Sequence, residues 1–463
     1  MTLIKSISGI RGTIGGAPGD NLTPLDIVKF AAAYGTWLKR RKGKLKVVVG
    51  RDGRVSGPMV QRLVIGTLQG IGLDVINLDM STTPTVEIAV PMEKAGGGII
   101  LTASHNPREW NALKLLNEKG EFLSAQDGQD ILELAAHEDF DFVLVGKLGS
   151  YKERTDYMDI HINKILEIPY VDVEAIKARN FKIVVDAVNS SGGIAVPQLL
   201  KALGVDDIVE LYCEPNGEFP HNPEPLPENL EGLSNEVTKQ NANIGIAVDP
   251  DVDRLCFVME NGEMFGEEYT LVSISDYILQ NKKGNTVSNL SSTRALKDVT
   301  EKHGAEHFDA AVGEVNVVDK MKEVDAVIGG EGNGGVIYPE LHYGRDALVG
   351  IALFLSHLAK SKKSISVLRS SYPNYHISKN KINLQEGMDV DGIIDAVREK
   401  YKKNPHSTID GLKIILDEDW VHLRKSNTEA IIRIYAESHS ATIAENIAKQ
   451  IMADIKELSA SLT

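Results

Sequence analysis

The chain has 463 residues, with 50 Lys and Arg against 65 Asp and Glu, which gives a formal net charge of −15. Its apolar fraction of 42% and charged fraction of 25% allow hydrophobic cores to form, which excludes a disordered or fibrous protein. The acidic balance argues against nucleic acid or an anionic membrane as a general partner, because only positive charge releases counterions from a phosphate-rich surface.

The cysteine content and the apolar segments predict where the protein resides. Cys213 and Cys256 have no CxxC spacing and make neither a disulfide framework nor a zinc cluster, which fits a reducing compartment. The first residues lack the apolar stretch of a signal peptide, and the most apolar window, residues 347–359, is too short to span a bilayer. We therefore expect a cytoplasmic protein.

The first predicted elements form a βαβ unit behind an N-terminal helix. Thr23 is a capping residue before a proline and an acidic first turn, which predicts a helix start there. A short apolar run at 45–50 is followed by a polar turn, a helical pattern from Pro58 and a second apolar run at 74–78. Strand, loop, helix and strand in this order indicate an α/β domain.

The same order of elements returns twice. A strand at 181–186 precedes a small-residue turn and a helix at 195–203, and a strand at 324–328 precedes a Gly-rich turn at 329–335 and a helix from Arg345. Three such units predict three related α/β domains rather than one large sheet.

The C-terminal part has a different pattern, typical of a smaller α+β domain with an antiparallel sheet. The predicted elements are strands at 377–384, 412–416, 420–423 and 430–436 and helices at 390–401 and 441–458. We place the four domains at residues 1–150, 151–255, 256–370 and 371–463.

The first candidate for chemistry is an acidic segment between two apolar runs. Asp249, Asp251 and Asp253 alternate, so on extended backbone their carboxylates project to one side and suit a hard cation such as Mg²⁺. A solvated acidic turn is the ordinary alternative. A calcium loop ending at Glu260 is the other, but it would need glycine where Arg254 stands and helices where the flanks indicate strands.

The second candidate is Ser104, which comes after a buried strand in a turn that an Asn-Pro pair restricts. Such a serine is well placed as a nucleophile or phosphate carrier, although a simple capping role explains the segment equally well. The hydrolase pattern GxSxG is absent, so His105 beside it does not indicate a catalytic triad.

The third candidate is the segment 330–335, which formally contains GxGxxG. Residues 336–339 do not start a helix, so a dinucleotide site lacks its required context. A loop whose glycines let the backbone approach a ligand, with Glu331 and Asn333 bonding hydroxyl groups, fits better than a purely structural turn.

The fourth candidate is the segment 424–429, between two predicted strands. Its two cations, two hydroxyls, amide and backbone N–H groups could hold a phosphate. A charged, solvated turn is the alternative.

Taken together, these segments resemble the α-D-phosphohexomutase superfamily, most closely its archaeal-type phosphoglucosamine mutases, with phosphomannomutase/phosphoglucomutase close behind. The matching motifs are SGIRG at 8–12, TASHNP at 102–107, DPDVDR at 249–254, GEGNGG at 330–335, GRDAL at 344–348 and RKSNTE at 424–429. The resemblance implies three related mixed-sheet α/β domains plus a smaller C-terminal α+β domain around a central cleft.

The resemblance also implies a role for each matching residue. The catalytic group would comprise the phosphoserine, an acid/base lysine, two arginines beside them and the neighbouring histidine: Ser104, Lys114, Arg254, Arg11 and His105. One Mg²⁺ would be held by Ser104, through its phosphate, and by Asp249, Asp251 and Asp253. Sugar and distal phosphate would be bound by Glu331, Asn333, Arg424, Ser426, Asn427, Thr428 and Arg433.

The implied activity interconverts glucosamine 6-phosphate and glucosamine 1-phosphate through a phosphoserine and a 1,6-bisphosphate. Glucose or glucosamine 1,6-bisphosphate would be the activator, sugar phosphates the partners, and the protein a monomer or homodimer. Three residues depart from common family patterns: Ala112, Glu314 and Asn333. A phosphomannomutase/phosphoglucomutase, or a Mg-dependent sugar phosphatase that lets water reach the phosphoenzyme, are the alternatives.

Overall fold

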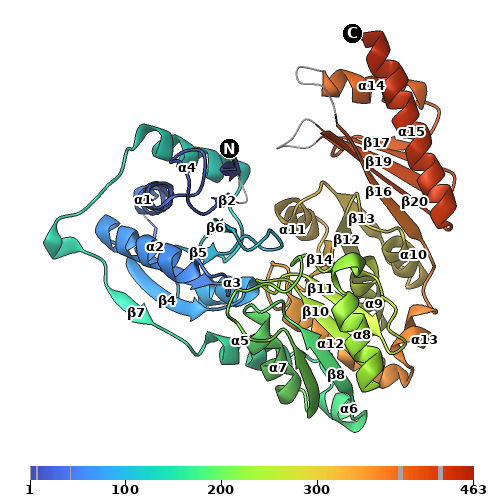
Figure 1. Cartoon of the computed structure of the whole chain (residues 1–463), viewed down its shortest axis with the longest axis horizontal. Coiled ribbons are helices and arrows are strands. Elements are labelled where there is room, and N and C mark those ends of the chain that lie inside the picture. Colours follow the sequence, from blue (N-terminus) through green and yellow to red (C-terminus); the bar gives the residue numbers. More distant parts are fainter. Residues whose placement is uncertain (1, 7–8, 42, 384–388, 426–430, 463) are drawn as a thin grey trace.

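Four β-sheets succeed one another along the chain in the computed structural model, within the residues it describes: 2–6, 9–41, 43–383, 389–425 and 431–462 (Figure 1). The first sheet lies at the left of Figure 1, the second and third at the lower right, and the fourth stands above them. This arrangement confirms the predicted fold class of three mixed-sheet α/β units and a smaller antiparallel one.

The first unit contains a mixed sheet of seven strands in the order β1-β2-β6-β5-β3-β4-β7. Its strands are β1 (Ile4–Ser6), β2 (Gly9–Thr13), β3 (Lys46–Arg51), β4 (Asp74–Met80), β5 (Gly97–Leu101), β6 (Trp110–Leu116) and β7 (Tyr151–Glu153). Its helices are α1 (Pro24–Arg40), α2 (Gly57–Ile71), α3 (Thr83–Met92) and α4 (Ala125–His137). The predicted start of α1 is confirmed, because Thr23 and Asp26 form a reciprocal capping box there.

The second and third units repeat one plan, in which three parallel strands carry an antiparallel strand at one edge. The second comprises β8 (Lys182–Asp186), β9 (Asp207–Leu211), β10 (Ile244–Val248), β11 (Leu255–Met259), α5 (Tyr157–Leu166), α6 (Val173–Ala178), α7 (Gly192–Ala202) and α8 (Glu231–Gln240). The third comprises β12 (Asn285–Asn289), β13 (His307–Ala310), β14 (Ala326–Glu331), β15 (Gly335–Ile337), α9 (Glu267–Asn281), α10 (Ala295–Lys302), α11 (Glu314–Glu323), α12 (Ala347–Ser361) and α13 (Ile365–Arg369).

The fourth unit is an antiparallel sheet in the order β16-β20-β19-β18-β17, with two helices packed against it. Its elements are β16 (His376–Asn383), β17 (His406–Ser407), β18 (Leu412–Leu416), β19 (Asp419–Lys425), β20 (Ile431–Ser438), α14 (Val390–Lys400) and α15 (Ala441–Leu462).

The second and third units share one continuous hydrophobic core, whereas the first and fourth units have cores of their own. Helix α12 joins the shared core, because it packs on α9 of the third unit and on α5, α6 and α7 of the second. This helix contains the most apolar window of the sequence, residues 347–359, and every residue of that window is buried. The window therefore lies at the centre of a protein core, and no helix in the described part of the chain is long and apolar enough to cross a membrane.

Candidate active site

Ser104 lies in the turn that comes after β5, as the sequence predicts. Its backbone has a φ of 48°, in the left-handed region, and its N–H donates to Thr102 Oγ1 at 2.9 Å. A non-glycine residue in this conformation is strained, so the surrounding structure must hold it there.

That support comes from Arg54, a buried residue that sequence reasoning missed. Its guanidinium donates to the carbonyl oxygens of Ser104, Asn106, Pro107 and Trp110 at 2.5–2.9 Å, and its Nε lies 3.1 Å from Asp52 Oδ2. One planar group with five donors thus holds the whole serine turn. The available signal was a polar Asp-Gly-Arg turn directly after the buried strand β3.

The three aspartates cluster in a turn between β10 and β11, and not on extended backbone as predicted. Val252 reverses the chain with a φ of 63°, and Asp249 Oδ1 accepts the N–H groups of Asp253 and Arg254 at 3.1 Å each. The residues therefore come together, but the reason is the turn and not the strand period.

The turn places the aspartates against the serine. Ser104 Oγ donates to Asp249 Oδ2 at 2.7 Å, which joins the first unit to the second at the point of expected chemistry. Burial, and then the neighbouring carboxylates of Asp253 and Asp251, raise the pKa of Asp249 well above its ordinary value.

Two cations from other elements balance the aspartates. Lys114 Nζ, on β6, lies 2.6 Å from Asp251 Oδ2 and 3.4 Å from Asp253 Oδ2. Arg345 Nη2 donates to Asp253 at 2.7 Å. Although burial opposes ionisation, Arg345 and Lys114 outweigh it and hold the pKa of Asp253 below its usual range.

The donor set fits a hard cation. One oxygen from each of the three aspartates lies within 4.8 Å of the others, and all three residues are buried. Asp251 Oδ1 and Asp253 Oδ1 lack a hydrogen-bond partner within the described part of the chain, so these buried oxygens are available as ligands.

The Gly-rich segment is a shorter loop than predicted, because Gly329 to Glu331 belong to β14 and β15 begins at Gly335. Glu331 Oε1 accepts from Asn289 Nδ2 and from the N–H of Gly313, and Glu331 Oε2 accepts from Arg345 Nη1 at 2.9 Å. A dinucleotide site is excluded here, since the loop leads into a strand and not a helix.

The unusual residue Glu314 has a structural partner in this region. Its Oε2 lies 3.1 Å from Arg345 Nε, and its Oε1 accepts the backbone N–H of Arg345 at 3.1 Å. Arg345 therefore touches Asp253, Glu331 and Glu314 together, and it is a second central residue that the sequence prediction did not include.

The C-terminal sheet presents two facing arginines. Arg424 on β19 stands opposite Arg433 on β20, and Arg424 Nε lies 2.8 Å from Asp410 Oδ2. Like charges directly opposite each other on a sheet repel, so an anion between them would be stabilising. The remaining predicted phosphate ligands, Ser426, Asn427 and Thr428, lie outside the described residues.

A cavity of about 620 Å³ brings residues of all four units together. The sequence-predicted residues that line it are Arg11, His105, Arg254, Glu331, Asn333, Arg424 and Arg433. Ser104, Lys114 and the three aspartates do not line it, but His105 and Arg254, which do, are immediate neighbours of Ser104 and Asp253 in the chain. Burial, and then the charge of Arg254, lower the pKa of His105 well below its ordinary value, so this imidazole is neutral.

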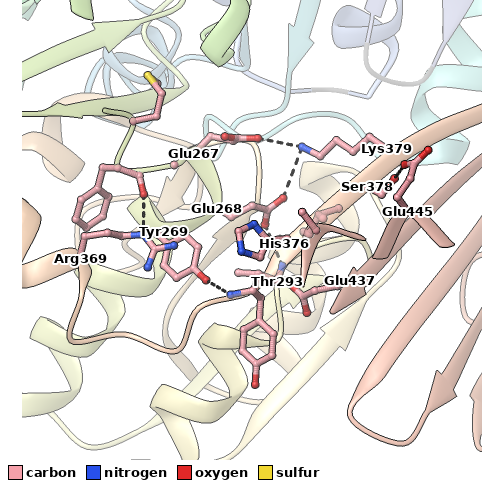
Figure 2. Close-up of a pocket in the computed structure, with 16 residues that line it drawn as sticks. Glu267, Glu268, Tyr269, Thr293, Arg369, His376, Ser378, Lys379, Glu437 and Glu445 are labelled. Carbon is pink, nitrogen blue, oxygen red and sulfur yellow. Dashed lines mark hydrogen bonds and ion pairs between the residues drawn. The ribbon is translucent and has the colours of Figure 1, made fainter. Parts of the chain in front are cut away.

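A second pocket of about 440 Å³ adjoins the cavity where the third and fourth units meet (Figure 2). Glu267, Glu268 and Lys379 line both spaces, and Lys379 Nζ lies 3.1 Å from Glu267 Oε1 and 3.8 Å from Glu268 Oε1. Burial, against the charge of Lys379, raises the pKa of Glu268 to about 8. This ion-paired group links the C-terminal sheet to α9 at the edge of the cavity.

This combination of four units, serine turn, acidic turn and cationic cavity defines a phosphoryl-transfer enzyme, and comparison with known proteins identifies the family. Domain profiles of phosphoglucomutase/phosphomannomutase match alpha/beta/alpha domains I, II and III over residues 3–142, 159–262 and 266–375, and the C-terminal domain over residues 381–454. The chain belongs to this family of the α-D-phosphohexomutase superfamily.

Individual relatives carry two kinds of name. A phosphoglucomutase/phosphomannomutase of Thermococcus kodakarensis is 38% identical over 93% of this chain and 94% of its own length. A phosphoglucosamine/phosphogalactosamine mutase of Sulfurisphaera tokodaii is 31% identical over 97% of this chain and 98% of its own. A crystal structure of a family member from Burkholderia thailandensis superposes with a TM-score of 0.85 at 26% identity, covering 99% of this chain and 98% of that one. The chain is a phosphohexomutase, which moves a phosphoryl group within a sugar phosphate.

Proposed function

We propose that the enzyme interconverts glucosamine 6-phosphate and glucosamine 1-phosphate through a phosphorylated Ser104 and a 1,6-bisphosphate intermediate. The observation that carries this proposal is the contact of 2.7 Å between Ser104 Oγ and Asp249, beneath a cavity that residues of all four units line. A serine that reaches the acidic turn of another unit is placed where a transferred phosphoryl group can be held from several sides.

In the first half-reaction, the bond between the phosphorus and Ser104 Oγ breaks while a sugar hydroxyl oxygen forms a new bond to the phosphorus. The sugar hydroxyl must lose a proton and Ser104 Oγ must gain one, and we assign this exchange to Lys114, whose Nζ lies 2.6 Å from Asp251 in the same cluster. Although burial opposes its charge, Asp251 and Asp253 raise the pKa of Lys114, so it would start as an ammonium ion that donates a proton to Ser104 Oγ and takes up the hydroxyl proton in return. The second half-reaction runs in reverse from the other phosphate of the bisphosphate, so that Ser104 is phosphorylated again.

Asp249, Asp251 and Asp253, together with a phosphate on Ser104, would hold one Mg²⁺. Mg²⁺ supplies, when bound, positive charge that offsets the charge on the equatorial oxygens of the transferred group. Arg254 and Arg11 line the cavity beside the serine turn and would add positive charge around the same oxygens.

The phosphate that is not being transferred would lie between Arg424 and Arg433. Asp410 already pairs with Arg424 at 2.8 Å, so the two arginines keep one excess positive charge, which a phosphate between them would balance. The bisphosphate must reverse its orientation without leaving the cavity, so this phosphate site has to accept the phosphate at either end of the sugar. Added glucose or glucosamine 1,6-bisphosphate would rephosphorylate enzyme that has lost its phosphate.

Glucosamine is our first choice of sugar, supported by the GEGNGG segment and by the Sulfurisphaera tokodaii relative. Glu331 and Asn333 from the Gly-rich loop line the cavity, and both side chains can accept hydrogen bonds from the hydroxyl or amino groups of a sugar. Glucose or mannose phosphate is the second candidate, favoured by the 38% identity to the Thermococcus kodakarensis relative.

The test is phosphorus NMR of the enzyme with Mg²⁺, catalytic bisphosphate and, separately, the 6-phosphates of glucosamine, glucose and mannose. The highest kcat/KM is expected for glucosamine, with modest discrimination, because one polar group at C2 leaves both phosphates unchanged. A higher kcat/KM for glucose or mannose would reassign the substrate. Free phosphate in excess over isomerised sugar would instead indicate a phosphatase.

A further inference from the structure

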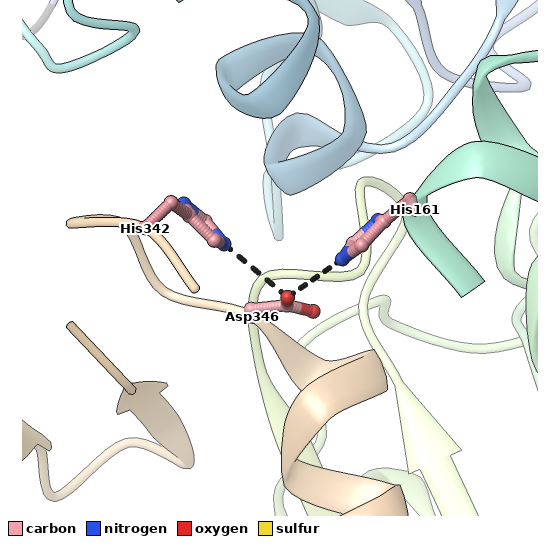
Figure 3. A group of neighbouring side chains, drawn as sticks. All are labelled: His161, His342 and Asp346. Carbon is pink, nitrogen blue, oxygen red and sulfur yellow. Dashed lines mark hydrogen bonds and ion pairs between the residues drawn. The ribbon is translucent and has the colours of Figure 1, made fainter. Parts of the chain in front are cut away.

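A second buried cluster of charged residues lies outside the cavity, where three segments of the chain meet. It contains His161 from α5, His342 and Asp346 from the segment before α12, and Glu87 from α3. His161, Asp346 and Glu87 are buried, and the His342 side chain is 11% exposed. Figure 3 shows the two imidazoles approaching Asp346 from opposite sides.

Both histidines present the same ring nitrogen to one carboxylate oxygen. His161 Nε2 lies 2.9 Å and His342 Nε2 lies 3.2 Å from Asp346 Oδ2. The other oxygen of Asp346 is already used, because it accepts the N–H groups of Leu348 and Val349 at the start of α12. Three potential ligand atoms therefore converge, each with the rest of its side chain fixed.

The Nδ1 atoms of both histidines also have polar partners. His161 Nδ1 is 2.9 Å from Thr85 Oγ1, and His342 Nδ1 is 3.3 Å from Glu87 Oε2. Metal-binding histidines characteristically direct their second nitrogen to such a hydroxyl or carboxylate, which orients the ring and sets its tautomer. Thr85 and Glu87 stand in these positions on one helix, α3.

The distances also fit a metal. Ligand bonds of about 2.0–2.2 Å at tetrahedral angles place neighbouring ligand atoms roughly 3.3 Å apart. The three candidate ligand atoms lie within 4.8 Å of one another, and the two contacts to Asp346 are 2.9 and 3.2 Å. Two imidazoles and one carboxylate select a transition metal over Mg²⁺, which prefers oxygen ligands alone.

We propose that His161, His342 and Asp346 bind Zn²⁺, with Glu87 and Thr85 orienting the two imidazoles. The ion would link α5 of the second unit to the segment before α12 of the third, and through the orienting residues to α3 of the first.

Glu87 is the independent observation behind this assignment. Both of its carboxylate oxygens are buried, and apart from the 3.3 Å contact of Oε2 with His342 Nδ1 they have no hydrogen-bond partner within the described residues. The chain nevertheless makes room for it, since a Cβ at Gly344 would lie 1.9 Å from Glu87 Oε2. Burying the negative charge of Glu87 with no other donor costs free energy. A divalent cation bound to the opposite nitrogen of the His342 ring would offset this cost, because it makes the Nδ1–H group a stronger donor to the carboxylate.

The site would have a structural role next to the catalytic one. Arg345, which contacts Asp253, Glu331 and Glu314, directly precedes Asp346. At the start of α3, Thr83 Oγ1 donates to Asp251 Oδ2 at 2.6 Å. Zinc would therefore fix the two segments that carry Arg345 and Thr83 without touching the substrate.

The first experiment measures Zn²⁺ binding to metal-free protein by calorimetry and elemental analysis, with Mg²⁺ in large excess to occupy the aspartate turn. One Zn²⁺ per chain is expected in the wild type and none in His161→Gln or His342→Gln. His221→Gln is the matched control. His221 Nε2 lies 2.9 Å from the carboxylate of Asp186, which has no second histidine beside it within the described residues. It should keep the full zinc content.

Glu87→Gln sharpens the result, because loss of an orienting partner typically weakens metal affinity by about 10–100-fold without abolishing binding.

The second experiment needs no variant. X-ray absorption of the zinc-loaded wild type should show two imidazole ligands. No zinc in the wild type, zinc retained by both histidine variants, or an all-oxygen ligand shell would each overturn the proposal, and in the last case the metal sits on the aspartates. None of these outcomes depends on the mutase assay.

Discussion

The two sides of the catalytic cavity differ in how their charged side chains are paired. On the serine side, Arg54 satisfies four carbonyl groups and Asp52, and Lys114 pairs with Asp251 and Asp253. On the C-terminal side, Arg424 and Arg433 face each other across two strands. Asp410 pairs with Arg424, which leaves one excess positive charge on this side. The difference indicates that the chemical groups are positioned before substrate arrives, whereas the charge of a bound phosphate would balance the remaining charge of the two arginines.

Ser104→Ala should have the largest effect, because it removes the proposed phosphate carrier. Turnover should fall by several orders of magnitude, since no covalent intermediate can form. Phosphorus NMR would measure the isomerisation, and mass spectrometry would show whether the phosphoryl group is gone. A variant that still carries the label would move the carrier role to another residue.

Arg54→Met tests how much Arg54 contributes to the stability of the serine side of the cavity. The substitution leaves Asp52 buried without its cation, a loss that typically costs about 3–5 kcal/mol of stability. Urea unfolding of the full chain, monitored by circular dichroism, would measure it.

Arg51→Gln is the control for that measurement, because its ion pair with Asp79 is partly exposed and should contribute only about 0–1 kcal/mol. Equal losses in the two variants would contradict the central role given to Arg54.

Arg424→Ala should weaken the phosphate hold while leaving Ser104 able to accept phosphate. Losing one charged hydrogen bond costs about 1.5–3 kcal/mol, or roughly a tenfold to hundredfold higher KM. The variant should also leak bisphosphate and depend on added 1,6-bisphosphate for sustained turnover, which a coupled assay would show.

Lys425→Ala is the neighbouring control, because successive side chains on β19 point to opposite faces. Its KM should change little. If Arg424→Ala keeps the wild-type KM and needs no added bisphosphate, the two arginines form a solvated surface instead of a phosphate site.

The smallest effect concerns Glu268 at the junction in Figure 2. Because burial raises its folded-state pKa from 4.5 to about 8, the folded protein holds an extra proton between these values, and stability should fall as pH rises through this range. Glu268→Gln should flatten that decline, with about 1 °C of melting temperature for each kcal/mol in a chain of this length. Calorimetry across this pH range would test it.

Much of the site could be predicted because its parts are continuous segments. The serine turn, the acidic turn and the Gly-rich loop each place several chemical groups within six residues, so residue type and spacing alone indicate them. The boundaries of the domains and the roles of Ser426, Asn427 and Thr428 stay predictions. The extended backbone assumed for the aspartates was wrong, because a positive φ at Val252 reverses the chain there.

The residues that could not be predicted are those whose partners lie far away in the chain. Arg54 acts on a turn about fifty positions later, and Arg345 reaches Asp253 on another unit. The Asp-Gly-Arg turn and the GRDAL motif mark these positions, but neither pattern gives the role of the arginine, since burial and partners appear only when the sheets pack together.

The sequence by itself therefore determined the order of elements, the three α/β units, the serine turn and the clustering of the aspartates, because hydrophobic period, capping and residue spacing act over a few residues. Only the tertiary structure decided that the second and third units share one core around α12, and that His161, His342, Asp346 and Glu87 meet behind the cavity. Such contacts depend on long-range packing, which local residue patterns do not encode.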